Sequence, residues 1–135
     1  MSQLIESFEQ RYLLGVSEMD DTHREFVELV NQLDNADDQT FIPLFEQLIK
    51  HTSSHFAAEN EKMQECGFPA IREHTEEHLR VLGDLERFGK RVAAGNIAMG
   101  RAYVTQQLPD WFDLHARTMD SALAHHLKPC IVTFT

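Results

Sequence analysis

The stretch HFAAE at residues 55–59, together with a second pair of histidines at His74 and His78, decides how the chain folds. Side chains four residues apart lie on the same face of an α-helix. His55 and Glu59 therefore point to one place, and so do His74 and His78. Two such pairs on neighbouring helices form a cage of metal donors, so the sequence predicts a helical protein built around a metal site.

Apolar residues that recur every three or four positions predict four helices. These cover approximately residues 17–33, 38–67, 70–94 and 96–128. Residues 1–16 show no sustained period, and we expect an ordered arm that is mostly coil. Because the connections are short, neighbouring helices run antiparallel. The sequence thus predicts an all-α, up-down-up-down four-helix bundle with an N-terminal arm, in one domain that spans residues 1–135.

The ends of the helices have their own signals. Ser17 with Asp20 resembles a capping box at the start of the first helix, and Gly67 is a typical stop for the second. Pro109 lacks an amide hydrogen and is expected to bend or break the fourth helix, which Pro129 then closes.

Composition and charge exclude several classes of function. The chain has a net charge of −10, which argues against nucleic acid or an anionic membrane surface as a partner. It shows neither a signal peptide nor the ~18 apolar residues that a membrane span needs, so a soluble, cytoplasmic protein is expected. Cys66 and Cys130 match no paired motif and are interpreted as ordinary free thiols of a reducing compartment.

Seven ionisable side chains fall on the predicted inward faces of the helices. Burying them without a metal would be costly, and a structural zinc site closes at four donors. We therefore expect two metals that share both carboxylates as bridges; imidazole and carboxylate donors without thiolate suit iron or manganese, with iron preferred. The seven residues are His23, His55, Glu59, His74, His78, His115 and Asp120.

The number of donors also predicts an asymmetric centre. With both carboxylates and a solvent-derived bridge shared, a metal bound by three histidines is six-coordinate. A metal bound by two histidines is five-coordinate and keeps a vacant position for a diatomic ligand.

His115 and Asp120 are five residues apart, which is about 140° around an ideal α-helix. They share a face only if the helix is locally widened or unwound. The spacing therefore predicts a π-type bulge or irregular turn between them.

In these motifs the chain resembles the hemerythrin-like proteins of the bacterial type over nearly its full length. The family pattern is Asp-x-x-His, His-Phe-x-x-Glu, His-x-x-x-His, and Trp-x-x-x-His with Asp five residues later. It occurs here at residues 20–23, 55–59, 74–78 and 111–115, with Asp120. The resemblance implies that one iron is held by His74, His78 and His115 and the other by His23 and His55. It further implies that Glu59, Asp120 and an oxo or hydroxo group bridge the two irons.

The resemblance also implies a pocket for O2. Phe56 and Trp111 match aromatic residues of the family pocket. Two neighbouring positions depart from the family, because the usual Leu and Ile are replaced by Phe112 and Ala116. We expect all four side chains to line the O2 pocket, with a larger side chain than usual at Phe112 and a smaller one at Ala116.

Other positions are expected to be peripheral. Thr22 and Asn60 also depart from the family pattern and are interpreted as surface variations. His51 is expected to be solvated or hydrogen-bonded, and His125 and His126 to be helix-end cations or surface groups.

The resemblance implies reversible O2 binding, for storage, delivery or sensing, by a protein that is not an enzyme. The predominance of neutral imidazole donors favours the same reading. Two alternatives stay open: an enzyme that consumes O2, peroxide or nitric oxide at the same centre, and a free-standing oxygen or redox signalling module.

Overall fold

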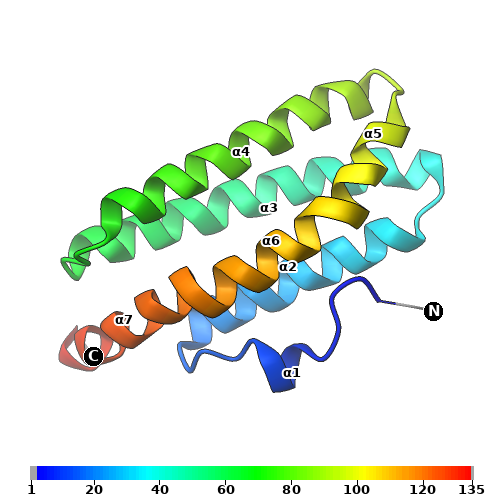
Figure 1. Ribbon diagram of the computed structural model, residues 1–135. Helices are drawn as coiled ribbons and strands as arrows, with labels where there is room; N and C mark the ends of the chain where they lie inside the picture. The colour runs from blue at the N-terminus through cyan, green and yellow to red at the C-terminus, as the bar shows by residue number, and fades with distance from the viewer. Residues whose placement is uncertain (1–2, 135) are drawn as a thin grey trace.

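The computed structural model describes residues 3–134, with side chains described as far as residue 130. Four long helical segments pack side by side along the molecule (Figure 1). The first three are α2 (Ser17–Asn35), α3 (Asp38–Glu65) and α4 (Ile71–Ala93). The fourth segment is composite and consists of α5 (Ile97–Ala102), the π-helix η1 (Tyr103–Gln107), α6 (Leu108–His115), the π-helix η2 (Ala116–Asp120) and α7 (Ser121–Phe134). No strand occurs between residues 3 and 134. The predicted antiparallel four-helix bundle is confirmed.

The start of α2 differs from the predicted capping box. Ser17 is the first helical residue, Val16 precedes it, and no side chain caps the helix. The Asp20 carboxylate instead accepts hydrogen bonds from the backbone N–H groups of Leu14 and Gly15, at 2.8 and 3.1 Å. Asp20 therefore fixes the end of the N-terminal arm to the first turn of α2.

The other helix ends follow the sequence signals closely. The cap of α3 is Asp37, whose side chain accepts a hydrogen bond from the backbone N–H of Thr40 at 2.8 Å. Gly67 and Gly95 follow α3 and α4 with positive φ angles of 60° and 94°. A residue without Cβ adopts this conformation without strain, so Gly67 ends α3 as expected and Gly95 ends α4 in the same way.

The two prolines interrupt the fourth segment less than predicted. Pro109 is the second residue of α6 and follows the π-helix η1. A helix does not need the amide hydrogens of its first turn, so the wider turn of η1 places Pro109 where it is tolerated. The expectation that Pro129 closes the helix is wrong, because α7 continues through it to Phe134.

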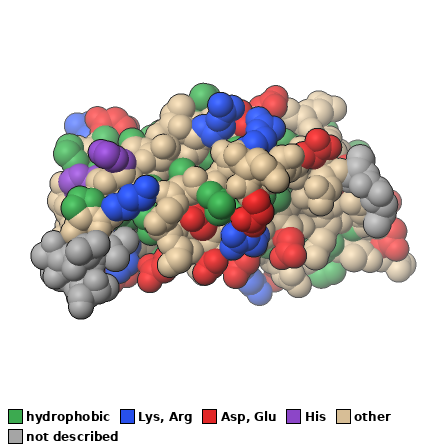
Figure 2. Space-filling view, turned by 90° about the horizontal axis from the view of Figure 1, so that it is seen from below, with side chains coloured by type: hydrophobic (Ala, Val, Ile, Leu, Met, Phe, Trp, Pro, Cys, Tyr) green, Lys and Arg blue, Asp and Glu red, His purple; other side chains and the backbone are tan. Residues whose placement is uncertain are grey.

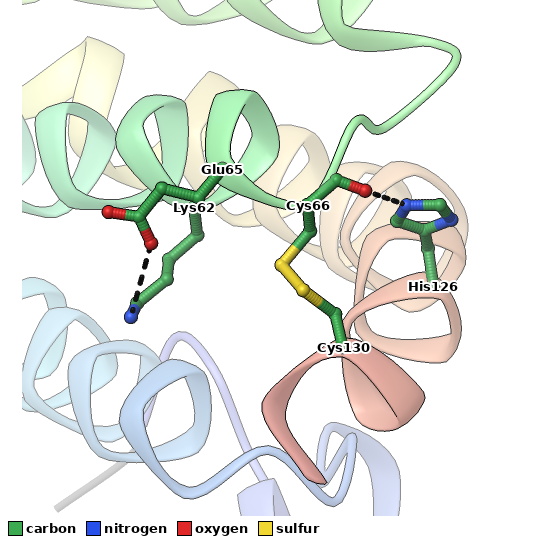
Figure 3. The surroundings of a disulfide bond; sticks show 5 residues. All are labelled: Lys62, Glu65, Cys66, His126 and Cys130. Carbon is green, nitrogen blue, oxygen red and sulfur yellow. Dashed lines mark hydrogen bonds and ion pairs between the residues drawn. A yellow bond between two sulfur atoms is a disulfide. The ribbon is translucent and has the colours of Figure 1, made fainter. Parts of the chain in front are cut away.

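The two cysteines form a disulfide, so the expectation of free thiols is wrong. Cys66 follows the last residue of α3 and Cys130 lies in α7, 64 residues further along the chain (Figure 3). His126 donates a hydrogen bond from Nε2 to the backbone carbonyl of Cys66, at 2.7 Å. The packing of α7 against the end of α3 brings the cysteines together, and no spacing in the sequence encodes that packing.

The N-terminal arm is mostly coil, as predicted, with one short helix, α1 (Phe8–Arg11). Asn31 on α2 accepts from the backbone N–H of Ile5 and donates to its carbonyl. The Tyr12 hydroxyl donates to Asp113 on α6, at 2.6 Å. The arm is thereby attached to the first and the last of the long helical segments.

The apolar core has two parts. The larger cluster includes Phe41, Phe45, Leu85 and Leu108 and occupies the end of the bundle where α4 meets α5. The smaller one lies toward the disulfide and consists of Val16, Met19, Met63, Phe68, Leu123, Ala124 and Leu127. Most of the buried polar residues lie where these clusters meet, although His55 and His115 each come just before a member of the larger cluster, Phe56 and Ala116.

The surface carries mixed charge. On the face shown in Figure 2, Lys and Arg side chains are interspersed with Asp and Glu and do not gather into one patch. The exposed large apolar side chains include Leu13, Leu79, Met99 and Leu114, which lie on four different elements or connections. Within the described residues no helix is both long and apolar enough to cross a membrane.

Candidate metal centre

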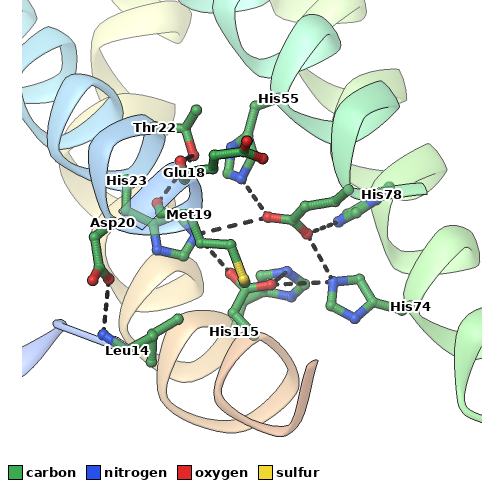
Figure 4. A network of polar contacts seen from close by, with 12 residues as sticks. Leu14, Glu18, Met19, Asp20, Thr22, His23, His55, His74, His78 and His115 are labelled. Carbon is green, nitrogen blue, oxygen red and sulfur yellow. Dashed lines mark hydrogen bonds and ion pairs between the residues drawn. The ribbon is translucent and has the colours of Figure 1, made fainter. Parts of the chain in front are cut away.

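All four long segments send polar side chains to one level of the bundle. In Figure 4 the five histidine rings of this layer point toward one another from their helices. Each of the seven residues predicted from the sequence is buried. They are His23 from α2, His55 and Glu59 from α3, His74 and His78 from α4, His115 at the end of α6, and Asp120 at the end of η2.

Glu59 lies where α3 faces α4. His55, one turn earlier on the same helix, makes a short contact with its Oε2 atom. The Nε2 atoms of His74 and His78 both lie 3.2 Å from Oε1. The spacing of four residues on each helix thus brings three imidazoles to one carboxylate.

Asp120 reaches the same layer through a π-helix. The predicted irregularity is confirmed, because η2 covers Ala116–Asp120. A π-helix bonds residue i to residue i+5, so Asp120 lies on the same face as His115. Its Oδ1 is 3.2 Å from Nε2 of His115 and 3.1 Å from Nε2 of His74, and its Oδ2 is 3.0 Å from Nε2 of His23.

The donor atoms fall into two groups, in each of which they lie within 4.8 Å of one another. One group has three histidines and a carboxylate, and the other has two histidines and a carboxylate. The histidines are grouped as the family resemblance implied, whereas each carboxylate, expected as a bridge, falls into one group. The groups are His74, His78, His115 and Asp120, and His23, His55 and Glu59.

The residues present fit metal ions. Among the described side chains, many buried nitrogen and oxygen atoms without a hydrogen-bond partner belong to this layer. They include Nε2 of His23, His74, His78 and His115, Oε1 of Glu59 and Oδ1 of Asp120. These atoms approach one another at ion-pair distances but without the angles of hydrogen bonds. Unpaired polar atoms are costly inside a protein, and two cations between the groups would satisfy them.

The pKa values of the buried donors show how the charge of this layer is balanced when no metal is bound. Burial and the charge of Asp120 raise the pKa of Glu59, but contacts with three histidines outweigh them and hold that pKa below its usual value. Burial opposes the charged form of His74, yet contacts with Asp120 and Glu59 raise its pKa to about 9. Burial is the largest effect on His78 and lowers its pKa. The two ionised carboxylates therefore need positive charge, supplied by protons or by metal.

The outward-facing nitrogen of one ring has a partner that the sequence did not reveal. His78 donates from Nδ1 to the Asn60 side-chain oxygen, at 2.9 Å. Asn60 is only partly exposed, so its interpretation as a surface variation is wrong. Its signal in the sequence is its place next to Glu59, on the side of α3 that faces α4. Thr22 is partly buried too, and its hydroxyl donates to the Met19 carbonyl at 3.0 Å.

His51 is confirmed as a hydrogen-bonded histidine beside the layer. Its Nε2 is 3.0 Å from the Thr22 carbonyl oxygen. His125 is exposed, as expected, whereas His126 is partly buried and bonded to Cys66.

Aromatic rings cover two of the imidazoles. Phe56 stacks on His78 with ring centres 3.8 Å apart, and Trp111 stacks on His115 at 4.7 Å. Trp111 is fixed in turn by a 2.9 Å hydrogen bond from Nε1 to Glu77. The bond from Arg80 to Glu77, aided by that from Trp111, lowers the pKa of Glu77 to about 2 despite its partial burial.

A cavity of about 10 Å³, which we call the inner cavity, lies on the His23 and His55 side of the layer. Three of the four predicted pocket residues line it, namely Phe56, Trp111 and Phe112. Phe26 also lines it and was not predicted. Ala116 is fully buried but does not line the inner cavity.

Phe112 is held in place on three sides. Its ring stacks on Phe26 at 5.2 Å and meets the Tyr12 and His23 rings edge to face, at 5.0 and 5.6 Å. The N-terminal arm therefore supports the aromatic wall next to His23.

Comparisons with known proteins agree with this geometry. The family described as Hemerythrin HHE cation binding domain matches residues 14–127. A bacteriohemerythrin of Ralstonia nicotianae is 37% identical over 107 residues, which cover 79% of this chain and 77% of that protein. A bacteriohemerythrin of Stenotrophomonas maltophilia is 28% identical over 121 residues, covering 85% and 76%. Crystal structures of two hemerythrin mutants share the fold, each with a TM-score of 0.85 at 22% identity over 93% of this chain and 98% of theirs.

The match covers all four helical segments and the level at which the seven donors meet. The chain therefore belongs to the hemerythrin family, whose members hold a di-iron centre, and this membership supports a di-iron, oxygen-binding role in general terms.

Proposed function

We propose that the chain binds O2 reversibly at two iron ions and serves oxygen storage, delivery or sensing. The observation that carries the proposal is the division of seven buried donors into a three-histidine group and a two-histidine group. His74, His78 and His115 would hold one iron, and His23 and His55 the other. Glu59 and Asp120 lie between the groups and would bridge them. When bound, the two ferrous ions supply the two electrons that reversible O2 binding requires.

The protein's own part is to fix the donors and to exclude water. The rings of Phe56 and Trp111 hold His78 and His115 in their orientations, and Asn60 directs Nε2 of His78 inward. Phe112 and Phe26 give the inner cavity an apolar wall beside His23. The inner cavity is far too small for an organic substrate, which favours binding of a small ligand over turnover of an organic substrate.

Anaerobic reduction followed by titration with O2, observed by visible absorption, tests the proposal. We expect two irons per chain and a reversible spectral change on adding and removing O2. One metal per chain, or zinc at full occupancy, would contradict the di-iron assignment. Sustained consumption of O2 with a reductant would instead indicate the enzyme that consumes O2, peroxide or nitric oxide.

The remaining assignments are parts of this proposal. We take residues 1–135 as one hemerythrin-like domain and expect neither nucleic acid nor a membrane as partner, because the net charge is −10. The cytoplasmic location stays a prediction. The two cysteines do not support this location, because they form a disulfide and disulfides persist in oxidising compartments. Cell fractionation tests it.

A further inference from the structure

A second cavity, which we call the outer cavity, lies between α2, α3 and α7. Its volume is about 340 Å³, and its lining includes the two donors His55 and Glu59. It is lined by Val16, Glu18, Met19, Asp21, Thr22, His55, Ala58, Glu59, Lys62 and Leu127. Figure 4 shows Glu18 and Thr22 near His55.

The apolar and charged side chains that line the outer cavity determine which molecules can enter it. Val16, Met19 and Leu127 are buried apolar residues of the smaller core cluster. The charged groups of the lining, besides Glu59, are Glu18, Asp21 and Lys62. Lys62 is 3.8 Å from Glu65 and Asp21 is 3.0 Å from Arg24, so both charges are offset and Glu18 makes the rim acidic on balance. An acidic rim around an apolar interior disfavours anions and admits small neutral molecules.

The two cavities share one residue, His55. It is also the most exposed of the seven donors, at 7%. The inner cavity, at about 10 Å³, is close to the smallest volume that holds one water molecule. The inner cavity is therefore too small to serve as a channel, whereas the much larger outer cavity borders the same imidazole.

We propose that the outer cavity is the access route by which small neutral molecules, of the class of dioxygen, reach the His55 and Glu59 side of the centre. The identity of O2 as its cargo rests on the proposed function. The route itself rests on the volume, the apolar lining and the contact with two donors.

The disulfide holds one wall of this route. Lys62 lies on α3 one turn before Cys66, which follows that helix (Figure 3). Leu127 lies on α7, almost one turn before Cys130. The cross-link thus fixes the two helices whose side chains bound the cavity on the side of the disulfide.

Ala58→Phe is the first test, because Ala58 lines the outer cavity from an exposed position and a phenyl ring there narrows the way to His55 and Glu59. Ala57→Phe is the matched control, since Ala57 is exposed on the same helix and lines neither cavity. Ala58→Leu is a milder variant in case Ala58→Phe does not fold. Thermal unfolding establishes that each variant is folded.

Two measurements are made on these proteins. Xenon binding by ¹²⁹Xe NMR reports occupation of the apolar cavity without metal, and stopped flow reports binding of O2 and nitric oxide to the reduced di-iron protein. We expect xenon binding in the parent and in Ala57→Phe and its loss in Ala58→Phe. Both gases should bind about tenfold more slowly to Ala58→Phe, as expected if overfilling raises the barrier to passage.

The outcomes separate the route from the function. Parental rates for both gases in a folded Ala58→Phe protein, or no xenon in the parent, overturn the access route and leave O2 binding intact. If the parent does not bind O2 reversibly but nitric oxide still binds more slowly to Ala58→Phe, the proposed function fails and the route stands.

Discussion

The imidazole of His78 is held by a neighbour that carries no charge. Asn60 accepts its Nδ1–H at 2.9 Å, which leaves Nε2 facing Glu59. Partners of this kind fix the tautomer and orientation of a metal-binding histidine. An uncharged acceptor holds the ring but polarises the Nδ1–H bond less than a carboxylate would.

Asn60→Ala should weaken iron binding. The loss of the hydrogen bond frees the His78 ring, and the loss of such a partner typically costs about 10- to 100-fold in metal affinity. Asn60→Asp should retain binding, because a carboxylate accepts the same bond. Competition with an iron chelator measures the effect, and Gln64→Ala, an exposed change one turn along α3, serves as control. Equal affinity in all variants would mean that Asn60 does not position His78.

Phe112→Leu should speed the binding of azide and O2. The ring of Phe112 lines the inner cavity and lies 5.6 Å from that of His23, so a smaller side chain widens the space beside the two-histidine group. By admitting water it should also speed autoxidation. Ala116→Ile should slow binding, because Ala116 is fully buried and an added side chain displaces its neighbours.

Stopped-flow rates for these two variants provide the measurement. Leu114→Ala, on the exposed side of the same helix, is the control. Rates within about twofold of the parent in both variants correspond to less than 1 kcal/mol of barrier and would place Phe112 outside the path of the ligand.

At the level of elements, one of the two π-helices, η2, could be predicted from the sequence, and the other, η1, could not. The five-residue spacing of His115 and Asp120 demands a widened turn, and η2 provides it. Nothing comparable marks η1, which covers Tyr103–Gln107. There the sequence shows only Pro109 and predicts a bend or break, whereas the chain widens its helix just before the proline. A spacing of ligands fixes a geometry, but a proline excludes one hydrogen bond and leaves several ways to accommodate its loss.

The disulfide was beyond prediction for a related reason. Cys66 and Cys130 are separated by 64 residues, and only the way α7 packs on the end of α3 decides whether they meet. Apolar periodicity predicts which face of each helix is buried, but not the relative height of two helix ends.

Replacing both cysteines by serine should destabilise the protein. In the chain-entropy model, closing a loop of 64 residues contributes about 4 kcal/mol at 25 °C, within the usual range of roughly 2–5 kcal/mol. Urea unfolding of the parent, with and without a thiol reductant, and of the Cys66→Ser, Cys130→Ser double variant measures this. The reductant should shift the midpoint of the parent and not that of the variant. Two alkylatable thiols in the untreated protein would contradict the cross-link.

For the whole molecule, a polar layer lies between two apolar clusters. Each of the four helical segments passes through this layer once, so a single alignment of the helices along the bundle brings all seven donors to one level. For this reason the positions of the donors in the sequence predict both a bundle and a candidate site. The sequence could not supply what lies around the layer. Asn60, Phe26 and the outer cavity depend on how side chains from different helices fill the remaining space.

Protons and iron compete for this layer, so the stability of the whole molecule should depend on pH in opposite ways with and without metal. In the metal-free protein His74 has a pKa of about 9, raised by Asp120 and Glu59 against the effect of burial. Its stabilising contribution is fully present below the unfolded value of about 6.5 and is lost as pH rises through about 9. Iron needs neutral imidazoles, so the iron-loaded protein loses metal as pH falls toward and below about 6.5.

The increase in thermal stability on iron binding should therefore grow with pH over the range from about 6 to about 9. Thermal unfolding of metal-free and iron-loaded protein across this range, with iron retention measured in parallel, tests it. His74→Gln removes the titrating group and should flatten the curve of the metal-free protein. His51→Gln, outside the cluster, should leave it unchanged. If the metal-free and iron-loaded curves run parallel, protons and iron do not share these nitrogens, and histidine ligation of the metal is wrong.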